Sequence, residues 1–257
     1  MNFFIKLALV ILIPSFITQA DETKLKLASD EWCPFICIQG KQISHGFLVD
    51  ASKDILKHAN VNLTSLLLPL NRAMILAEQG KIDGIYAPTI SDRFINSMPL
   101  TYSRACFFVN RQNKWRYTDI KDLSPVTVNV VDDYGYDGGP FDAFLSNAKK
   151  SKAANIIFRT GDIAAKTNVQ LLLKQRIEIL LEHEAVMSHL LTERNETHQI
   201  RKAGCLKHAL PLVIGISNSH PNAKELIQTF NVGLTKLIES GRFTQLMETY
   251  HLTANQF

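Results

Sequence analysis

Residues 23–87 alternate between the two periods of regular secondary structure. Apolar side chains predict a strand, a helix, a strand, a helix and a strand, in that order, over residues 23–32, 46–60, 61–69, 70–80 and 82–87. In the second helix Ala73, Leu76 and Ala77 share a face, and Gly80 stands where a left-handed C-cap is expected. Strands that alternate with helices are typical of a parallel sheet.

The second half of the chain repeats this architecture without repeating the sequence. An apolar strand at residues 103–112 is followed by alternating strands and helices at residues 126–131, 141–150, 154–159, 163–176 and 177–182. A strand at 208–217 and helices at 220–241 and 242–252 end the pattern. The first of these helices is amphipathic, with an apolar face made of Leu226, Ile227, Phe230, Leu234, Leu237 and Ile238. The pattern predicts an α/β protein with mixed, mainly parallel sheets.

Residues 1–20 have the composition of a secretory signal peptide. Lys6 supplies a positive charge, an apolar run of about a dozen residues follows, and Ala20 places a small residue at a cleavage position. The run is shorter than the ~20 apolar residues that span a bilayer. The first cysteine, Cys33, is too far away for a lipoprotein anchor. We expect an exported, periplasmic chain with a cleaved signal peptide and no membrane insertion of the mature protein.

Charge and motif spacing leave several function classes without support. The 28 Lys and Arg residues nearly balance 24 Asp and Glu residues, and no basic run with interleaved aromatics suggests nucleic acid. His183 and His189 are six positions apart, so they do not share the helix face that a helical zinc motif requires. The glycine-rich residues 132–140 lack the spacing of a phosphate-binding loop. We expect no metal, no cofactor, no nucleic acid, and a monomer.

Four cysteines in an exported chain suggest disulfides. Three pairings are possible, and we expect a local Cys33–Cys37 bridge with a distant Cys106–Cys205 bridge. A zinc site is the alternative, but the spacing offers no second close pair of cysteines. Cys106 and Cys205 fall within residues 103–110 and 203–210, the two segments where the chain is expected to cross between lobes, so a bridge there would fasten the crossings together.

Arg93 follows the predicted strand at residues 82–87, at the edge of a parallel sheet where ligands collect. A guanidinium there can give two parallel hydrogen bonds to a carboxylate. The alternative is a solvated loop charge that pairs with Asp92. Arg72, at the start of a predicted helix, could reach the same edge, although a first-turn arginine is more often solvated.

An ordered set of motifs resembles the periplasmic extracellular solute-binding proteins of family 3, the polar amino-acid receptors of ABC importers. The motifs, in chain order, are SDEWCPF, GFLVDASKDIL, NRAMILAEQGKIDGI, TISDRF, PLTYSRACFFV, AGCL and NVGLTKLIESGRFTQLMETY. The resemblance covers nearly all of the mature chain and implies the type II fold, in which two α/β lobes joined by two hinge strands enclose a ligand. It implies a first lobe of residues 21–105 and 208–257, and a second lobe of residues 106–207.

The resemblance also assigns site residues on the first lobe. Arg93 matches the carboxylate clamp, Trp32 the aromatic that covers the ligand, and Phe35 its aromatic neighbour. The family usually has small hydroxyl residues at the end of the strand before the arginine, and here these positions are Tyr86 and Pro88. That departure puts an α-amino acid ligand in doubt.

On the second lobe, the resemblance assigns the loop that carries Asp133, Tyr134 and Tyr136 to the ligand's carboxylate. His183 stands where the family usually has an aspartate for the ligand's ammonium, and Glu182 could take that role instead. The acidic Asp133 would repel a carboxylate at close range.

These features predict a solute-binding protein that closes by hinge bending around a small polar ligand, an amino acid or a related compound, for an ABC permease. One alternative is an enzyme on the same fold, similar to periplasmic dehydratases, in which Glu182 or Asp133 acts as a general acid. Another is a sensory receptor that passes the signal to a membrane protein. No nucleophile–base–orienter set supports an enzyme, so we expect binding without turnover.

Overall fold

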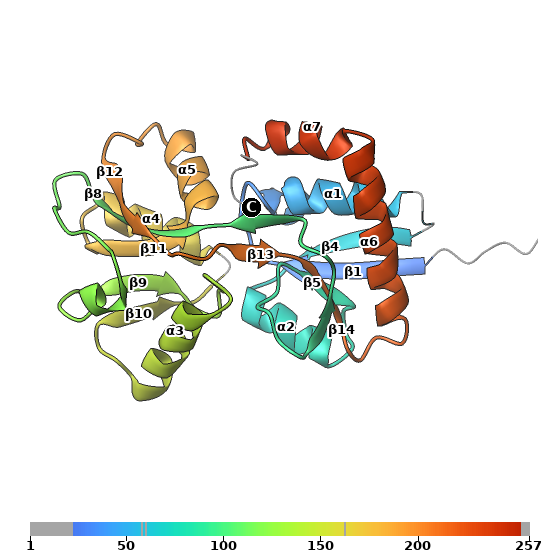
Figure 1. Ribbon diagram of the computed structural model, residues 1–257, viewed down its shortest axis with the longest axis horizontal. Coiled ribbons are helices and arrows are strands. Elements are labelled where there is room, and N and C mark those ends of the chain that lie inside the picture. Colours follow the sequence, from blue (N-terminus) through green and yellow to red (C-terminus); the bar gives the residue numbers. More distant parts are fainter. Residues whose placement is uncertain (1–22, 58, 60, 162, 253–257) are drawn as a thin grey trace, which may run out of the picture.

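Two five-stranded sheets, one in each of two lobes, form the framework of the protein (Figure 1). The structure is a computed structural model that describes residues 23–252 apart from 58, 60 and 162. The signal peptide expected at residues 1–20 lies outside the described residues. Among the helices of the described residues, none combines the length and the apolar character needed to cross a bilayer.

Lobe 1 contains the sheet with strand order β4-β1-β5-β14-β6. Its strands are β1 (Thr23–Ser29), β4 (Val61–Leu67), β5 (Gly84–Tyr86), β6 (Phe94–Asn96) and β14 (Ile214–Ser217). β1 pairs in parallel with β4 and β5, as the alternation of strands and helices predicts, whereas β14 returns from the far end of the chain and runs antiparallel between β5 and β6. The late segment therefore completes the first sheet.

Helices cover both faces of the lobe 1 sheet because side chains alternate along β1. Leu27 packs into the core cluster of α1 (Phe47–Leu56), α6 (Ala223–Glu239) and α7 (Arg242–Thr249), whereas Ala28 packs into the cluster of α2 (Leu70–Glu78). The apolar face of α6 is buried as expected except for Ile238, which is 54% exposed. Ile238 lies in the last turn of the helix, at the edge of the buried face.

Lobe 2 contains the sheet with strand order β10-β9-β11-β8-β12. Its strands are β8 (Ala105–Asn110), β9 (Val128–Val131), β10 (Ile156–Arg159), β11 (Ile179–His183) and β12 (Ile200–Cys205). β9, β10 and β11 are parallel, and β8 runs antiparallel between β11 and β12. Its helices are α3 (Pro140–Ser151), α4 (Ala164–Leu173) and α5 (Glu184–Glu193), with a 3₁₀ turn, η1, at Ile120–Leu123.

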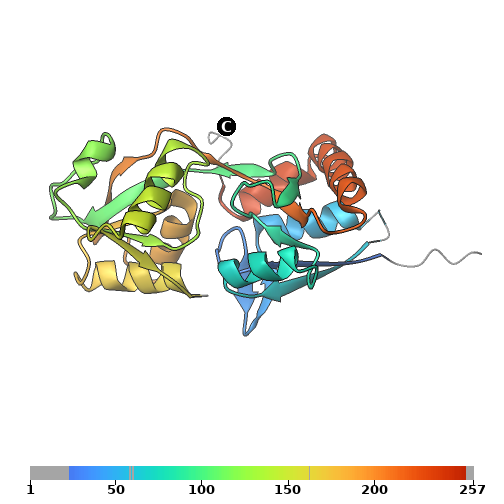
Figure 2. The ribbon, with the colours of Figure 1, turned by 90° about the horizontal axis from the view of Figure 1, so that it is seen from below.

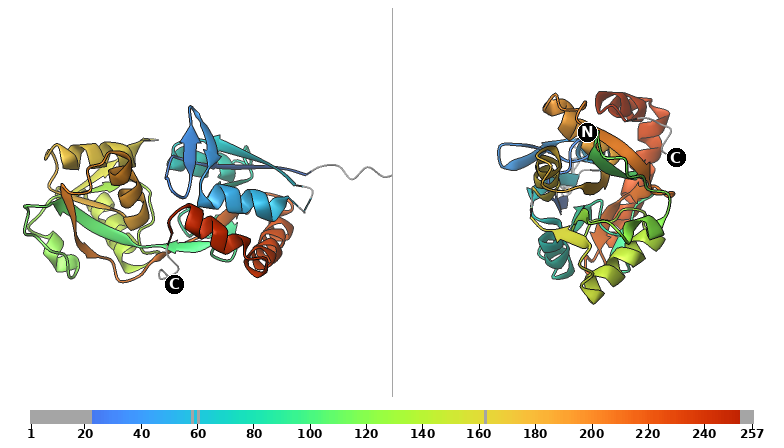
Figure 3. Two further views of the ribbon diagram at one scale, coloured as in Figure 1. Left: turned by 90° about the horizontal axis from the view of Figure 1, so that it is seen from above. Right: turned by 90° about the vertical axis from the view of Figure 1, so that its left-hand side faces the viewer.

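The chain crosses twice between the lobes, and Figures 2 and 3 show both crossings along the same side of the molecule. β7 (Thr101–Ser103) leads into β8, and β12 leads into β13 (Leu210–Leu212), which pairs antiparallel with β7. Cys106 and Cys205 stand opposite each other where β8 pairs with β12, and they form a disulfide. Cys33 and Cys37 form the second disulfide. Both are the expected pairs.

Several elements lie outside the pattern read from the sequence, among them the short strands β6 and β7 and the strand β12. β2 (Cys37–Gln39) and β3 (Gln42–His45) form a short hairpin with mostly polar, exposed positions, so no apolar period marks it. α5 directly follows β11, and its apolar side chains Val186, Met187, Leu190 and Leu191 are buried at helical spacing. The single strand expected at residues 208–217 is two strands, because the crossing at β13 ends before β14 enters the lobe 1 sheet.

Candidate ligand-binding cleft between the lobes

Away from the hinge strands, three polar contacts join the two lobes. The Tyr134 hydroxyl of lobe 2 donates to Asp30 Oδ2 of lobe 1 over 2.6 Å. The Thr89 hydroxyl donates to the Asp133 carbonyl over 2.9 Å. Lys166 at the start of α4 forms an ion pair with Glu31. The lobes are therefore in contact, and the structure shows a closed arrangement.

Trp32 lies at the centre of this contact and is only 6% exposed. It begins a tight turn in which its N–H donates to the Ile36 carbonyl over 2.8 Å, and the Cys33–Cys37 bridge spans the same turn. Its ring centroid is 4.8 Å from that of Phe35 in lobe 1 and 4.8 Å from that of His183 in lobe 2. Trp32 thus packs on both lobes at once.

Glu182 is a fully buried acid at the end of β11. Burial raises its pKa to about 8, against the lowering effect of a 2.7 Å hydrogen bond from the His183 N–H. The Trp32 indole lies close enough to lower the pKa of Glu182. The two groups are nevertheless not placed for a hydrogen bond of normal distance and angle. Glu182 Oε2 and Trp32 Nε1 both lack a hydrogen-bond partner among the described residues.

His183 is held as a neutral ring with one defined tautomer. Its Nε2 lies 2.9 Å from the Gly135 carbonyl, which can only accept, so the proton is on Nε2. Nδ1 accepts from the Ser103 hydroxyl over 2.9 Å. Burial lowers the pKa of His183 to about 4, and the ring stacks on Tyr136 with centroids 5.5 Å apart. Both ring nitrogens are occupied in this closed arrangement.

Tyr86 and Tyr136 use their hydroxyls within their own lobes. Tyr86 pairs with the Ser65 hydroxyl over 2.7 Å, and Tyr136 accepts from the Val131 N–H over 2.8 Å. Both are fully buried, and burial raises the pKa of each well above its ordinary value. Tyr86 still lines a small cavity beside Trp32 and Tyr134, whose volume of about 20 Å³ is far below that of an amino acid.

A larger cleft of about 340 Å³ opens next to this cavity. Lobe 1 contributes part of its wall, through Asn71, Met74, Thr89 and Arg93. Lobe 2 contributes the rest, through the last residue of β9 and the loop that follows it (residues 131–134), one side of α3 and Phe158. Because this volume is at the lower end of ligand-binding cavities, roughly 300–1,000 Å³, the cleft can hold a molecule the size of an amino acid.

Arg93 lines the cleft from the residue before β6. Its guanidinium pairs with Glu78 at the end of α2, with Nη1 and Oε1 2.7 Å apart, and its Nε donates to the Ser91 hydroxyl over 3.3 Å. The side chains of Arg93 and Glu78 are 41% and 39% exposed. Glu78, and not Asp92, is thus its partner, and the pair lies at the rim where solvent weakens it.

The opposite wall carries Lys149 between two carboxylates. Its ammonium lies 2.6 Å from Asp132 and 3.1 Å from Asp133. Partial burial lowers the pKa of Lys149, but the hydrogen bonds and charges of the two aspartates outweigh it and raise the pKa. This neutralisation reduces the repulsion that Asp133 alone would exert on an anionic ligand.

The loop between β9 and α3 presents Asp133 and Tyr134 because it is held from behind. Asp142 in α3 accepts from the Tyr136 N–H over 2.8 Å and from the Gly138 N–H over 2.9 Å. Asp133 has a positive φ of 62°, a left-handed conformation that aspartate tolerates better than most residues. These constraints turn Tyr134 toward lobe 1.

The structure thus brings together most of the residues expected from the sequence, but not all in the same role. Trp32, Tyr86, Asp133, Tyr134 and Arg93 line the two cavities between the lobes. Phe35 is fully buried behind Trp32, and Arg72 is exposed on α2 away from the cleft lining. Glu182, His183 and Tyr136 are buried beneath the contact.

Asp30, Thr89 and Lys149 were missed by the sequence reasoning. Asp30 follows β1 at the same sheet edge as Arg93, so the rule that selected Arg93 would also have selected Asp30. Lys149 is one of three consecutive polar positions on α3, and no local signal separates it from a solvated lysine.

Several solved structures share this fold. A histidine kinase sensor domain with similarity to periplasmic binding proteins matches with a TM-score of 0.75 and 14% identity, over 90% of this chain and 97% of that chain. An ancestral arginine-binding protein bound to arginine matches with a TM-score of 0.71 and 19% identity, over 88% and 97%. An ancestral amino acid-binding protein, a precursor of cyclohexadienyl dehydratase, gives 0.67 and 18%, over 88% and 94%.

No family model matches the chain, and no curated protein matches it. The structural matches show that the chain has the two-lobe α/β fold of the periplasmic binding proteins. The fold class implied by the sequence motifs is confirmed. Because the identities are below 20%, the matches show the fold of this chain and do not identify its ligand.

Proposed function

We propose that this protein is a periplasmic solute-binding protein that captures a small polar ligand, an amino acid or a related compound, between its lobes and presents the closed form to an ABC permease. The observation that carries the proposal is a cleft of about 340 Å³ whose walls come from both lobes. A ligand that touches both walls binds the closed state better than the open one and shifts the population toward closure.

The charges around the cleft support a zwitterionic or cationic ligand. Arg93 and Lys149 supply two cations for a carboxylate, once each releases one of its present partners. Asp30 supplies a carboxylate for an ammonium beside the ring of Trp32, where a cation also gains from the aromatic face.

Tyr134 has to move before a ligand can reach that inner position. In the closed arrangement its hydroxyl bonds to Asp30, and the space left beside Trp32 is only about 20 Å³. Opening of the lobes breaks this bond and exposes Asp30, Trp32 and the Glu182 carboxyl to the ligand. The paired β7 and β13 strands between the lobes are the segments expected to bend.

A second candidate is an enzyme on the same fold. The observation in its favour is Glu182, whose pKa of about 8 keeps its carboxyl protonated at neutral pH beside the interlobe contact, as a general acid requires. One structural match is a precursor of a dehydratase. A sensory role, in which a membrane kinase replaces the permease, is the third candidate, and one match is a kinase sensor domain.

A thermal-shift screen of residues 21–257 against amino acids, amines and small carboxylates tests the proposal. A ligand at about a hundred times its dissociation constant adds about 2.7 kcal/mol to the free energy of unfolding. X-ray scattering should then show no larger radius of gyration with the ligand than without it. Mass spectrometry of each stabilising compound separates binding from turnover, because a solute-binding protein returns it unchanged. If none of these compounds stabilises the protein, the proposed function is wrong.

A further inference from the structure

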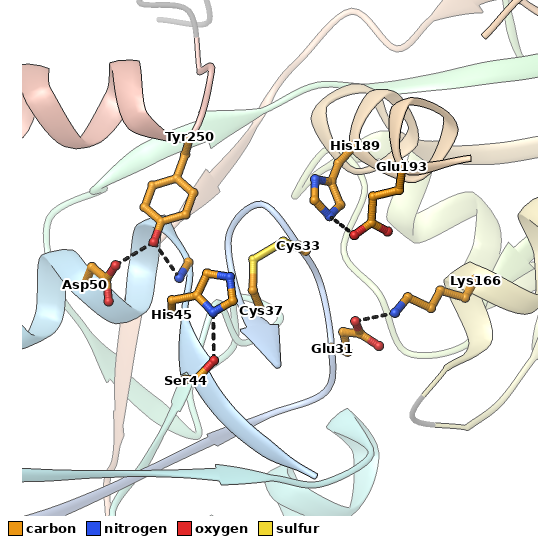
Figure 4. Close-up of a disulfide and its surroundings, with 11 residues drawn as sticks. Glu31, Cys33, Cys37, Ser44, His45, Asp50, Lys166, His189, Glu193 and Tyr250 are labelled. Atoms are coloured by element: carbon orange, nitrogen blue, oxygen red, sulfur yellow. Dashed lines mark hydrogen bonds and ion pairs between the residues drawn. A yellow bond between two sulfur atoms is a disulfide. The ribbon is translucent and has the colours of Figure 1, made fainter. Parts of the chain in front are cut away.

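A second groove between the lobes, of about 350 Å³, contains the Cys33–Cys37 disulfide (Figure 4). Lobe 1 lines it with both cysteines, His45 and the chain end after α7, including His251. Lobe 2 lines it with His189 and Glu193 of α5. Three of the eight histidines of the chain therefore line the groove that contains this disulfide, and His189 pairs there with Glu193.

The two cysteines of this bridge differ in exposure. Cys37 is 3% exposed, whereas Cys33 is half-buried and faces the groove. A thiolate that enters the groove can therefore reach the Cys33 sulfur more easily, which makes Cys37 the leaving group. The rate of such an exchange depends on access to the attacked sulfur and on how well the leaving thiolate is stabilised.

His45 is placed to stabilise that leaving thiolate. In the β2–β3 hairpin Cys37 and His45 are cross-strand partners next to a bulge between Cys37 and Ile38, and Figure 4 draws the His45 ring beside the disulfide. The Ser44 hydroxyl lies 2.7 Å from His45 Nδ1, and when it donates there the proton of the neutral ring is on Nε2. An imidazole N–H beside a cysteine favours the thiolate.

The hinge disulfide has different surroundings. Cys106 is fully buried between the paired strands β8 and β12, and its partner Cys205 is half-buried. Its Sγ lies 3.9 Å from a carboxylate oxygen of Glu184. Glu184 also forms an ion pair with Lys202, and the carboxylate oxygen next to Cys106 disfavours a thiolate at that sulfur. One disulfide therefore lies in a groove with three histidines in its walls, and the other lies beside the Glu184–Lys202 ion pair within the hinge.

We propose that Cys33–Cys37 is a thiol–disulfide exchange site for a dithiol. One thiolate of the dithiol attacks the Cys33 sulfur, the S–S bond breaks, and its electron pair goes to the Cys37 sulfur, which takes a proton through His45. The second thiol of the dithiol then attacks its own sulfur in the mixed disulfide and releases Cys33 as a thiolate, which takes up a proton. The dithiol is oxidised to a disulfide, and the protein bridge gains two electrons and two protons.

Reduction of this bridge should weaken the contact between the lobes, because Trp32 connects the two. The bridge spans the turn between Trp32 and Ile36, and the Trp32 ring packs on Phe35 and across the lobes on His183. Reduction removes the covalent closure of that turn and loosens the Trp32 ring. The exchange itself does not depend on any ligand of the main cleft, so it can be tested whether or not the proposed function holds.

The test is timed reduction of the oxidised mature protein by dithiothreitol at pH 7, with acid quenching, alkylation and peptide mass spectrometry. A parallel arm uses a reduced thioredoxin-like protein as the dithiol. We expect Cys33 and Cys37 to be alkylated about tenfold faster than Cys106 and Cys205, or more. Comparison of the reduction rate of Cys33–Cys37 in the two arms shows whether this bridge reacts faster with a small-molecule dithiol or with a protein dithiol. Equal rates, or faster reduction of the hinge bridge, in both arms would overturn the proposal.

Two variants separate the site from general accessibility. His45→Gln should slow reduction of Cys33–Cys37 severalfold and leave Cys106–Cys205 unchanged, whereas His198→Gln, at an exposed histidine outside the groove lining, should change neither. Trp115→Phe leaves Trp32 as the only tryptophan of the chain, and its emission should shift when the bridge is reduced. An unchanged rate in His45→Gln would remove His45 from the mechanism and contradict the proposed site.

Discussion

The hydroxyl of Tyr134 donates a 2.6 Å hydrogen bond to Asp30 across the gap between the lobes. Tyr134 belongs to the loop after β9 in lobe 2, and Asp30 follows β1 in lobe 1. Desolvation and the negative charge of Asp30 raise the pKa of Tyr134 well above its ordinary value, so the hydroxyl keeps its proton and remains a donor. This bond fills the position next to Trp32 that a ligand would need. A ligand can therefore enter that position only after the lobes open and the bond breaks.

Tyr134→Phe should shift the ligand-free protein toward an open arrangement. The variant leaves buried Asp30 without this donor, at a cost of about 1–3 kcal/mol that falls only on the closed state. Small-angle X-ray scattering should report a larger radius of gyration than for the wild type. Tyr136→Phe is the matched control, because Tyr136 bonds to Val131 within lobe 2, and this variant should lower stability without opening the lobes. Equal radii for all three proteins would contradict this role of Tyr134.

Glu182 should make the protein less stable as the pH rises toward 8. In the folded state its pKa is raised from 4.5 to about 8, so the folded protein keeps a proton that the unfolded chain loses. The contribution to stability is full below pH 4.5 and falls as the pH rises to about 8, by about 3–5 kcal/mol in total.

Thermal unfolding of Glu182→Gln between pH 6.5 and 8.5 measures this effect, because the glutamine does not titrate. The variant should show a flatter pH dependence and should exceed the wild type in stability at pH 8.5. His183 does not obscure this window. Its pKa is lowered from 6.5 to about 4, so its contribution is present above pH 6.5 and is lost as the pH falls toward 4. Parallel curves for variant and wild type would mean that Glu182 is ionised in the folded protein.

Arg93→Ala should weaken binding of a carboxylate ligand and barely change the stability of the free protein. The Arg93–Glu78 pair is about 40% exposed, and such pairs contribute about 0–1 kcal/mol. A charge-assisted hydrogen bond to a ligand contributes about 1.5–3 kcal/mol, so affinity should fall about ten- to a hundredfold. Calorimetric titration with a carboxylate from the screen measures this. Arg72→Ala removes an exposed arginine from α2 and should leave the affinity unchanged. Equal affinities of the two variants would show that Arg93 does not bind the ligand and is only a solvated charge at the rim of the cleft.

Loss of the hinge disulfide should cost more stability than loss of the groove disulfide. The chain-entropy model gives about 4.7 kcal/mol for a loop as long as the one between Cys106 and Cys205, whose separation is 99 residues. It gives about 2 kcal/mol for Cys33 and Cys37, whose separation is 4 residues. Urea unfolding of the two double alanine variants compares them directly. Equal losses, or a larger loss for the short loop, would show that strain or packing outweighs loop entropy here.

Much of the fold could be predicted because its elements carry local signals. The helix that ends before Gly80 is an example, since its apolar spacing and its C-cap both lie in consecutive residues, and Gly80 does adopt a left-handed φ of 66°. The β2–β3 hairpin carries no such signal. Its polar residues, including Gln42 and Ser44, show no apolar period, and pairing with the neighbouring strand is what defines them.

The site was less predictable than the fold for a related reason. Arg93 could be placed at a sheet edge from the order of elements alone, but its partner Glu78 lies 15 residues away at the end of another element. His183 looked like a ligand group in the sequence, but hydrogen bonds with the Gly135 carbonyl and the Ser103 hydroxyl occupy both of its ring nitrogens. Burial and partner choice depend on residues distant in sequence.

By itself, the amino-acid sequence determined the order of the main alternating strands and helices, the parallel character of β1 with β4 and β5, and where arginine and aspartate stand relative to strand ends. These follow from side-chain period and backbone preference, which act over a few residues. Only the tertiary structure decided that Tyr134 meets Asp30, that Glu182 is held as a buried acid, and that histidines gather around one disulfide. Those features come from packing two lobes together, and contact distance and desolvation exist only once the lobes have met.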